Sequence, residues 1–370
     1  LRTSDERYLR HVRDYYKVLM PYLAPLQITQ GGPVLMMQVE NEYGTFGNDK
    51  KYIKALRDMM REGGIDVPLF QSDGPADDIF QNTAVEDLFP TANFGSRGKI
   101  AFDCLKKYNH GGPCMCAELW VGWFDAWRSG KHHTTDADQA AKELREVLEG
   151  GSVNLYVAGG GTNFGFQNGA MRSLDGWYSQ LITSYDTAAP VSEAGDTREL
   201  YRMYRPLFAK YNPEFSINTP IPPDTPKAAY GEIALTEFAP LSRNLDALSL
   251  HATKSACPLT MEEIGGDYGF VRYTTHLKPQ SFKLPVKVLG LNDRGWVYYN
   301  GKFIKHIWKD NESFAIETGD GGTLEIIVEN RGRTNFYCNI EHNRKGITDG
   351  VILNGQQFQH GWTTAVMPME

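Results

Sequence analysis

Residues 31–43 read GGPVLMMQVENEY, and this stretch carries the pattern that decides the fold class. The unbroken run from Val34 to Val39, apolar apart from one glutamine, predicts a strand that is buried on both faces. Strands of that kind belong to parallel sheets whose faces are covered by other elements. Glu42 follows three residues after Val39, so the same stretch places a carboxylate at the carboxyl end of a strand.

The chain on both sides of this stretch alternates between helical and strand patterns. Apolar residues at helical spacing predict helices at 5–24, 49–62, 100–108 and 136–149, and apolar runs predict further strands at 67–73, 92–94, 114–119 and 153–157. Polar residues end several of these strands, which favours a barrel over a doubly wound sheet. We therefore predict an α/β fold with about five C-terminal units of a (β/α)8 TIM barrel, which is incomplete without about 100 residues upstream.

The pattern changes after a proline-rich stretch at 218–226. Short alternating segments at 269–273, 296–299 and 323–328 predict strands, and Asn300-Gly301 predicts a hairpin turn. We expect the barrel part at 1–215, a linker at 216–230 and a β-sandwich or jelly-roll module at 231–370.

Composition narrows the possible partners. The 370 residues are 41% hydrophobic and carry a formal net charge of −7, with no clustered basic residues, so nucleic acid is not an expected partner. No run of 18 apolar residues is present, so no membrane span is expected. The five cysteines lack the spacing of a zinc site or a disulfide scaffold, and Cys114 and Cys116 are expected to be buried free thiols. His132-His133 predicts a solvated loop. We expect no metal and no cofactor; the compartment and any homo-oligomer stay open.

Two carboxylates occupy corresponding places in the predicted barrel. Glu42 and Glu118 each close a predicted strand, and aromatic residues crowd both, among them Tyr43 and Trp123. Retaining glycoside hydrolysis needs two carboxyl groups about 5 Å apart, and aromatic rings can stack on sugars. Charged residues also cap strands without any catalytic duty, so this pair alone is weak evidence. We expect Trp123 to be a sugar platform, and Phe124 and Trp127 to be core residues beneath the loops.

The longer motifs resemble glycoside hydrolase family 35, the β-galactosidases. Residues 31–43 resemble its signature segment, and further similar motifs are SDGP at 72–75, ELWVGWFD at 118–125, GGTNF at 160–164, SYD at 184–186, SEAGD at 192–196 and VENRGRTNF at 328–336. The resemblance covers nearly the whole chain. It implies a β-galactoside as substrate and hydrolysis with retention.

The resemblance also implies roles for individual residues. Glu42 would be the general acid/base and Glu118 the nucleophile, with Asn41, Trp123, Tyr156 and Tyr185 in contact with the sugar or beside the nucleophile. Glu40 rivals Glu42 as the acid, but strand alternation places it on the same side and one pleat deeper, so we expect it to be buried and hydrogen-bonded.

One position departs from the family pattern. Where many members have a second tyrosine, in Ser-Tyr-Asp-Tyr-Asp, this chain has Thr187. That difference leaves open a related β-hexosidase, such as an exo-β-glucosaminidase. A carbohydrate-binding protein that does not cleave sugars is the alternative from another class.

Overall fold

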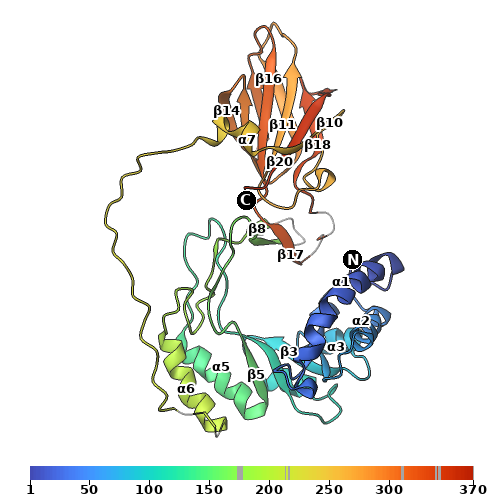
Figure 1. Cartoon of the computed structure of the whole chain (residues 1–370), viewed down its shortest axis with the longest axis vertical. Helices are drawn as coiled ribbons and strands as arrows, with labels where there is room; N and C mark the ends of the chain where they lie inside the picture. The colour runs from blue at the N-terminus through green and yellow to red at the C-terminus, as the bar shows by residue number, and fades with distance from the viewer. Residues whose placement is uncertain are drawn as a thin grey trace. The chain divides into compact units, whose positions relative to one another are not determined.

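The computed structural model describes the chain except for residues 173–177, 213, 216, 310–311, 338–339, 341–342 and 370. The described residues form two compact units (Figure 1). The first unit consists of residues 1–125, 131–161 and 184–226, and the second of residues 126–130, 162–183 and 227–370. The second unit therefore includes two segments that come from the barrel part of the sequence. The predicted domain bounds stay a prediction.

The first unit is built on a five-stranded parallel sheet. Its strands lie in chain order, as expected of successive βα units in a barrel wall. They are β1 (Met37–Asn41), β2 (Leu69–Asp73), β3 (Phe89–Phe94), β4 (Met115–Trp120) and β5 (Ser152–Tyr156). The five predicted strands and the parallel sheet are confirmed.

Helices alternate with these strands, and several begin at an aspartate. Asp5, Asp49 and Asp136 each accept a hydrogen bond from a backbone N–H of the first helical turn, which satisfies a donor that the helix leaves unpaired. The helices are α1 (Glu6–Leu23), α2 (Lys50–Glu62), α3 (Asp77–Thr83), α4 (Gly98–Leu105), α5 (Ala137–Gly150) and α6 (Glu199–Tyr211). Short 3₁₀ helices lie at Ala24–Leu26, Ile28–Gln30 and Tyr43–Thr45.

Apolar strand residues pack against the helices, and polar residues occupy the opposite face. Val39 and Leu69 share a core with α1 and α2, while Ala92 and Leu119 share another with α4 and α5. In β5, by contrast, Asn154 lies at an exposed position between half-buried apolar neighbours. Helices that pack on one face of a parallel sheet are typical of a barrel wall rather than of a doubly wound sheet.

Strand β1 differs from its prediction. It begins at Met37 rather than Val34, and Leu35 is 65% exposed, so the apolar run is not buried throughout. The reason is position: β1 lies at one end of the strand order and has a single partner, β2, in the described sheet.

The second unit contains a β-sandwich, which confirms the predicted β module. A six-stranded antiparallel sheet and a four-stranded sheet, β15-β12-β18-β19, contribute apolar side chains to one shared core, with Val271 and Ile326 from the first sheet and Val286 and Val351 from the second. The first sheet has β10 (Leu250–Ser255), β20 (Trp362–Met367), β11 (Phe270–Leu277), β16 (Gly322–Glu329), β13 (Arg294–Tyr299) and β14 (Lys302–Trp308). The second has β15 (Ser313–Ile316), β12 (Leu284–Asn292), β18 (Gly346–Leu353) and β19 (Gln357–Phe358). Short helices lie at Leu241–Arg243, Leu245–Leu248 and Glu262–Ile264.

The predicted hairpin at Asn300-Gly301 is confirmed. Tyr299 pairs with Lys302, which leaves a two-residue loop between β13 and β14. Asn300 and Gly301 have φ values of 47° and 74°, as a turn of type I′ requires of both central residues.

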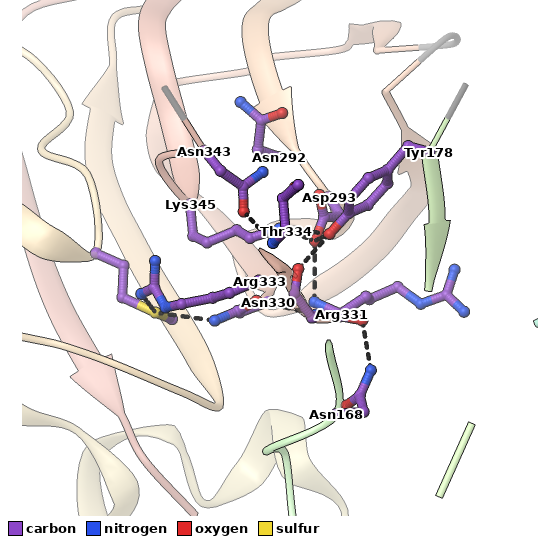
Figure 2. A network of polar contacts seen from close by, with 12 residues as sticks. Asn168, Tyr178, Asn292, Asp293, Asn330, Arg331, Arg333, Thr334, Asn343 and Lys345 are labelled. Atoms are coloured by element: carbon purple, nitrogen blue, oxygen red, sulfur yellow. Dashed lines mark hydrogen bonds and ion pairs between the residues drawn. The ribbon is translucent and has the colours of Figure 1, made fainter. Parts of the chain in front are cut away.

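A ribbon from the barrel part of the sequence is fastened inside the second unit. Strands β7 (Gly169–Arg172) and β8 (Tyr178–Gln180) pair with each other, and β7 pairs with β17 (Arg333–Tyr337). Fully buried Lys345 donates to the Asp293 carboxylate at 2.8 Å and to the Tyr178 hydroxyl at 2.6 Å (Figure 2). The hydrogen bond to Tyr178 thereby joins the segment that carries β8 to the sandwich.

Described residues 217–239 are exposed and lie outside helices and strands. Cys114 and Cys116 are buried free thiols, as predicted, Cys104 and Cys257 are also free, and Cys338 lies outside the described residues. In the described part of the chain, no helix has the length and apolar character needed to cross a membrane.

Candidate active site

A row of polar side chains crosses four neighbouring strands at their carboxyl ends. The Asn93 Nδ2 amide lies 3.2 Å from Glu42 Oε1 and 3.2 Å from Asn41 Oδ1. Asn93 is also the direct neighbour of Glu118 in the pairing of β3 with β4, and its side chain favours the ionised Glu118 carboxylate. Ser72, on β2, donates its hydroxyl to Asn93 Oδ1. One buried amide group is therefore in contact with both predicted catalytic carboxyl groups.

A tight turn after β1 sets the position of Glu42. Glu42 has a φ of 53°, in the left-handed region, and its backbone N–H donates to Ser72 O at 2.8 Å. The next turn residue, Gly44, donates its N–H to Asp73 at 2.9 Å, and a Cβ atom there would lie 2.4 Å from Ile79 O. The glycine is required by this close approach. Buried Asp73 thus holds the turn that carries Glu42.

The surroundings of Glu118 act on its ionisation in opposite directions. Burial raises the pKa of the Glu118 carboxyl, and the nearby Glu42 charge raises it further. Trp120 Nε1, 3.1 Å from Glu118 Oε2, opposes the rise by donating a hydrogen bond to the carboxylate, as does Asn93. The net pKa lies above the ordinary glutamate value.

Two tyrosines lie beside this pair. Tyr156, at the end of β5, and Tyr185, in β9 (Ser184–Tyr185), have hydroxyl oxygens 3.1 Å apart. Burial, the Tyr156 hydrogen bond and the Glu118 charge raise the pKa of Tyr185. Tyr185 thus senses the Glu118 charge, and Tyr156 is hydrogen-bonded to Tyr185; a position of Tyr156 close to the nucleophile stays a prediction.

Aromatic rings continue outward from Tyr185. The Phe124 ring stacks on Tyr185 at a centroid distance of 6.1 Å and on Trp123 at 4.6 Å. Trp123 is 44% exposed and so can offer a face to a ligand. The expectation that Trp127 is a core residue is wrong, because it is 53% exposed and its ring lies 4.6 Å from the Arg331 guanidinium, within the second unit.

Glu40 is held away from the site. Its carboxylate accepts from the Tyr52 hydroxyl of α2 at 2.9 Å and forms an ion pair with Arg2 at 2.8 Å. The prediction that it is hydrogen-bonded is confirmed, and its side chain is 11% exposed. Its predicted side is wrong: the pairing of β1 with β2 shifts register between Gln38 and Asn41, which breaks the strict alternation and turns Glu40 toward α2.

Described contacts thus connect Asn41 with Glu42 through Asn93, and Tyr156 and Trp123 with Tyr185, while Glu118 acts on Tyr185 through its charge; the roles of all six residues stay predictions. Asn93 and Asp73 were missed as site residues. Asn93 lies in a strand that was predicted from three residues only, and nothing in its neighbourhood of the sequence distinguishes it from a structural asparagine. Asp73 carried a usable signal, because it ends a predicted strand just as Glu42 follows one.

The described residues contain no group of three His, Cys, Asp or Glu side chains that could hold a metal ion. His132 and His133 instead direct Nδ1 toward Asp125, at 2.6 and 2.9 Å. Burial acts to raise the pKa of Asp125, but these hydrogen bonds outweigh it, so the pKa lies below the ordinary value.

Two family models match different parts of the chain. The model described as glycosyl hydrolases family 35 matches residues 1–211, which is more than half of the chain. The model described as the first all-beta domain of beta-galactosidase matches residues 258–369.

Individual relatives agree with these models. This chain is 38% identical over 381 residues to the beta-galactosidase of Homo sapiens and 38% identical over 381 residues to that of Pongo abelii, in each case over 100% of this chain and 54% of the relative. It is 32% identical over 412 residues to beta-galactosidase 1 of Dictyostelium discoideum, over 100% of this chain and 60% of that protein. The chain therefore spans about half the length of the relatives it matches.

Proposed function

The chain belongs to glycosyl hydrolases family 35, and we propose that it forms part of a retaining exo-β-galactosidase. The substrate would be a terminal, non-reducing β-linked galactose of an oligosaccharide or glycoconjugate. This choice of sugar rests on the names of the relatives, which are beta-galactosidases.

The observation that carries the proposal is the Asn93 amide in contact with both carboxyl groups. A side chain that touches Glu42 and Glu118 together fits the separation of about 5 Å in retaining glycosidases better than the roughly 6.5–9.5 Å of inverting ones. A retaining enzyme needs this short distance because one carboxylate attacks the sugar directly.

The reaction would proceed in two displacements. Glu118 attacks the anomeric carbon while protonated Glu42 gives its proton to the departing oxygen, which leaves a galactosyl ester on Glu118. Glu42, now ionised, takes a proton from water, and the water oxygen attacks the same carbon and releases Glu118. Asn41, whose Oδ1 bonds the Asn93 amide, is suited to hold the 2-hydroxyl of the sugar.

The test uses the protein expressed from its whole reading frame and a panel of nitrophenyl glycosides. We expect hydrolysis of the β-galactoside, with β-galactose as the first product by NMR. In Glu118→Gln we expect kcat to fall by roughly 10⁴-fold or more. Glu40→Gln is the matched control, because it neutralises a carboxylate that bonds Tyr52 and Arg2 instead. We expect it to keep most of the activity.

Three outcomes would contradict the proposal. Preferred cleavage of a β-glucosaminide would favour the related β-hexosidase. Sugar binding without cleavage by a folded protein would favour a carbohydrate-binding protein, and α-galactose as first product would mean inversion.

A further inference from the structure

The Gln38 side chain lies beside Asn41 at the carboxyl end of β1. Its amide Nε2 is 2.8 Å from Asn41 Oδ1 and 3.0 Å from the backbone carbonyl oxygen of Glu40. All three residues belong to the first unit. The double displacement described above gives Gln38 no part, so these two hydrogen bonds have no assigned purpose.

An irregularity in β1 brings Gln38 and Asn41 to the same side. In a regular strand, two residues that are three positions apart point to opposite faces of the sheet. The pairing of β1 with β2 shifts register between Gln38 and Asn41, and the 2.8 Å contact shows that their side chains meet. Irregularities of this kind re-aim side chains and are common beside active sites. The shift that turns Glu40 toward α2 therefore also places the Gln38 amide against Asn41.

A backbone carbonyl determines which end of each amide is the donor. The Glu40 carbonyl can only accept, so the Gln38 atom beside it is the NH2 group. The same NH2 group lies beside Asn41 Oδ1, which must therefore be the oxygen end of that amide. Asn93 Nδ2 donates to this oxygen as well, at 3.2 Å, and to Glu42 at 3.2 Å. One set of donors and acceptors thus satisfies all three amides.

The two bonds to Oδ1 leave Nδ2 as the free end of the Asn41 amide. Nδ2 carries two N–H donors, no described residue accepts from them, and Asn41 is exposed. Asn41 is therefore prepared to donate a hydrogen bond to an oxygen atom of a ligand rather than to accept one. The oxygen of a sugar hydroxyl is such an acceptor, and bonds to the 2-hydroxyl strengthen in the transition state of glycoside hydrolysis.

Gln38 provides the stronger of the two holds on this orientation. Its bond to Asn41 Oδ1 is 2.8 Å long, whereas the bond from Asn93 is 3.2 Å long and comes from an NH2 group that also serves Glu42. If Gln38 lost its donor, the Asn41 amide would be freer to turn over and present its oxygen instead. A carbonyl oxygen cannot donate, so the bond to the ligand oxygen would be lost in that orientation.

We propose that Gln38 is a positioning residue: anchored on the Glu40 carbonyl, it holds Asn41 Oδ1 and so keeps Asn41 Nδ2 as the donor to the 2-hydroxyl oxygen of the galactose. Gln38 acts only through Asn41. The inference rests on the proposed function, because the contact between Asn41 and the 2-hydroxyl is part of that function.

The test uses Gln38→Met in the protein expressed from its whole reading frame, since methionine has a similar length and no donor. The substrates are nitrophenyl β-galactoside and its 2-deoxy analogue, which lacks the hydroxyl in question. We expect kcat/KM for the galactoside to fall about five- to tenfold more than kcat/KM for the 2-deoxy analogue, as the loss of one hydrogen bond predicts. A merely structural role would lower both values equally.

Gln38→Glu is the second variant. Glutamate has the shape of glutamine, but an ionised carboxylate only accepts, so it should draw Asn41 Nδ2 toward itself and turn the oxygen toward the sugar. We expect the preference for the galactoside over the 2-deoxy analogue to fall at least as far as in Gln38→Met. A glutamate variant that keeps the parent's preference would contradict the positioning role.

Gln27→Met is the matched control. Gln27 is 1% exposed, and its Nε2 donates to Ala24 O and Gly64 O, both at 2.9 Å. Its Oε1 accepts from the backbone of Asp66 and Val67, which precede β2, whereas the site lies at the carboxyl ends of the strands. This variant should melt at a lower temperature and keep the parent's ratio of the two substrates.

Binding separates the role of Gln38 from the proposed reaction. In the Glu118→Gln background, Gln38→Met should weaken calorimetric binding of galactose about five- to tenfold more than binding of 2-deoxygalactose. Equal effects on the two sugars, or none, would overturn the inference. Failure of the proposed function is seen separately, as parent protein that binds galactose better than 2-deoxygalactose and yet hydrolyses no β-galactoside.

Discussion

Single side chains decide how the two central carboxyl groups are used. Glu118 is partly buried, but Trp120 and Asn93 direct N–H groups toward it and so favour the ionised form that a nucleophile needs. Glu42 is presented by a left-handed turn that Asp73 braces through Gly44. The chemistry therefore depends on asparagine, tryptophan and aspartate residues that do not react themselves.

The Trp120 bond should be visible in the pH profile. Glu118 must be ionised to attack, so activity falls as the pH falls through its raised pKa. Trp120→Phe removes a donor to the carboxylate, which raises this pKa further. We expect the acid limb of kcat/KM against pH to move upward by about one unit, as a hydrogen bond to a charged group predicts.

Trp123→Phe serves as the control for that profile, because Trp123 stacks on Phe124 and has no described bond to Glu118. Its acid limb should stay in place even if KM rises. An unshifted limb in Trp120→Phe would show that the indole does not tune Glu118.

Asp73 should limit stability at neutral pH. Burial, together with the Glu40 and Glu42 charges, raises its pKa to about 6, although bonds from Gly44 and Thr83 oppose the rise. A carboxyl whose pKa is raised by folding contributes stability below its unfolded pKa, near 3.9, and loses it as the pH rises through about 6. Asp73→Asn should therefore be more stable than the parent by about 2–3 kcal/mol at pH 7 and indistinguishable from it at pH 4.

Urea unfolding at both pH values measures this difference. Asp224→Asn is the control, because it neutralises an aspartate in the exposed linker. It should leave the free energy of unfolding unchanged at pH 7 and at pH 4. A less stable Asp73→Asn at pH 7 would mean that the ionised carboxylate is the form that the turn requires.

At the scale of elements, the sequence predicted which segments form strands better than it predicted where a strand begins and on which face a side chain lies. The five parallel strands followed from apolar runs, and the hairpin at Asn300-Gly301 followed from turn chemistry. The side of Glu40 was not predictable, because one register shift between Gln38 and Asn41 reverses the alternation on which the prediction depended.

Contacts distant in sequence set the remaining limit. Asn93 became a site residue only when β1, β3 and β4 were brought together, and no local pattern encodes that arrangement. The pairing of β7 with β17, about 160 residues apart, likewise leaves no signal at either segment that differs from an ordinary strand. Local patterns therefore predicted the framework, whereas side-chain networks required the structure.

The ribbon formed by β7 and β8 should depend on the Lys345–Asp293 ion pair. Lys345→Met leaves the Asp293 carboxylate buried, with the Arg331 N–H and the Tyr178 hydroxyl as its remaining described partners. Breaking a buried pair on one side typically costs about 3–5 kcal/mol. We expect a loss of that size in the free energy of urea unfolding, with part of it restored when Asp293→Asn is added.

Lys302→Met provides the comparison, since this lysine is exposed in the β13–β14 hairpin. It should change stability by less than about 0.5 kcal/mol. Equal effects of the two lysine substitutions would contradict a fastening role for Lys345.

For the whole molecule, connectivity matters as much as the packing within each unit. Two segments of the chain, 126–130 and 162–183, belong to the second unit, and after each of them the chain returns to the first unit. All residues after 226 belong to the second unit. The linker at 217–239 is thus not the sole covalent connection between the units. Cutting it leaves β7 and β8 on the N-terminal fragment, whereas their partner β17 lies on the C-terminal one.

Limited proteolysis tests this consequence. Brief trypsin treatment should cut the exposed segment at Lys227 and give two bands in a denaturing gel. We expect the two fragments to elute together in size-exclusion chromatography, because the β7–β17 pairing and the Lys345–Tyr178 bond still join them. Under the same conditions, cut Lys345→Met protein should separate into its fragments more readily. Fragments that separate at once from the parent protein would mean that the linker, and not the ribbon, holds the chain together.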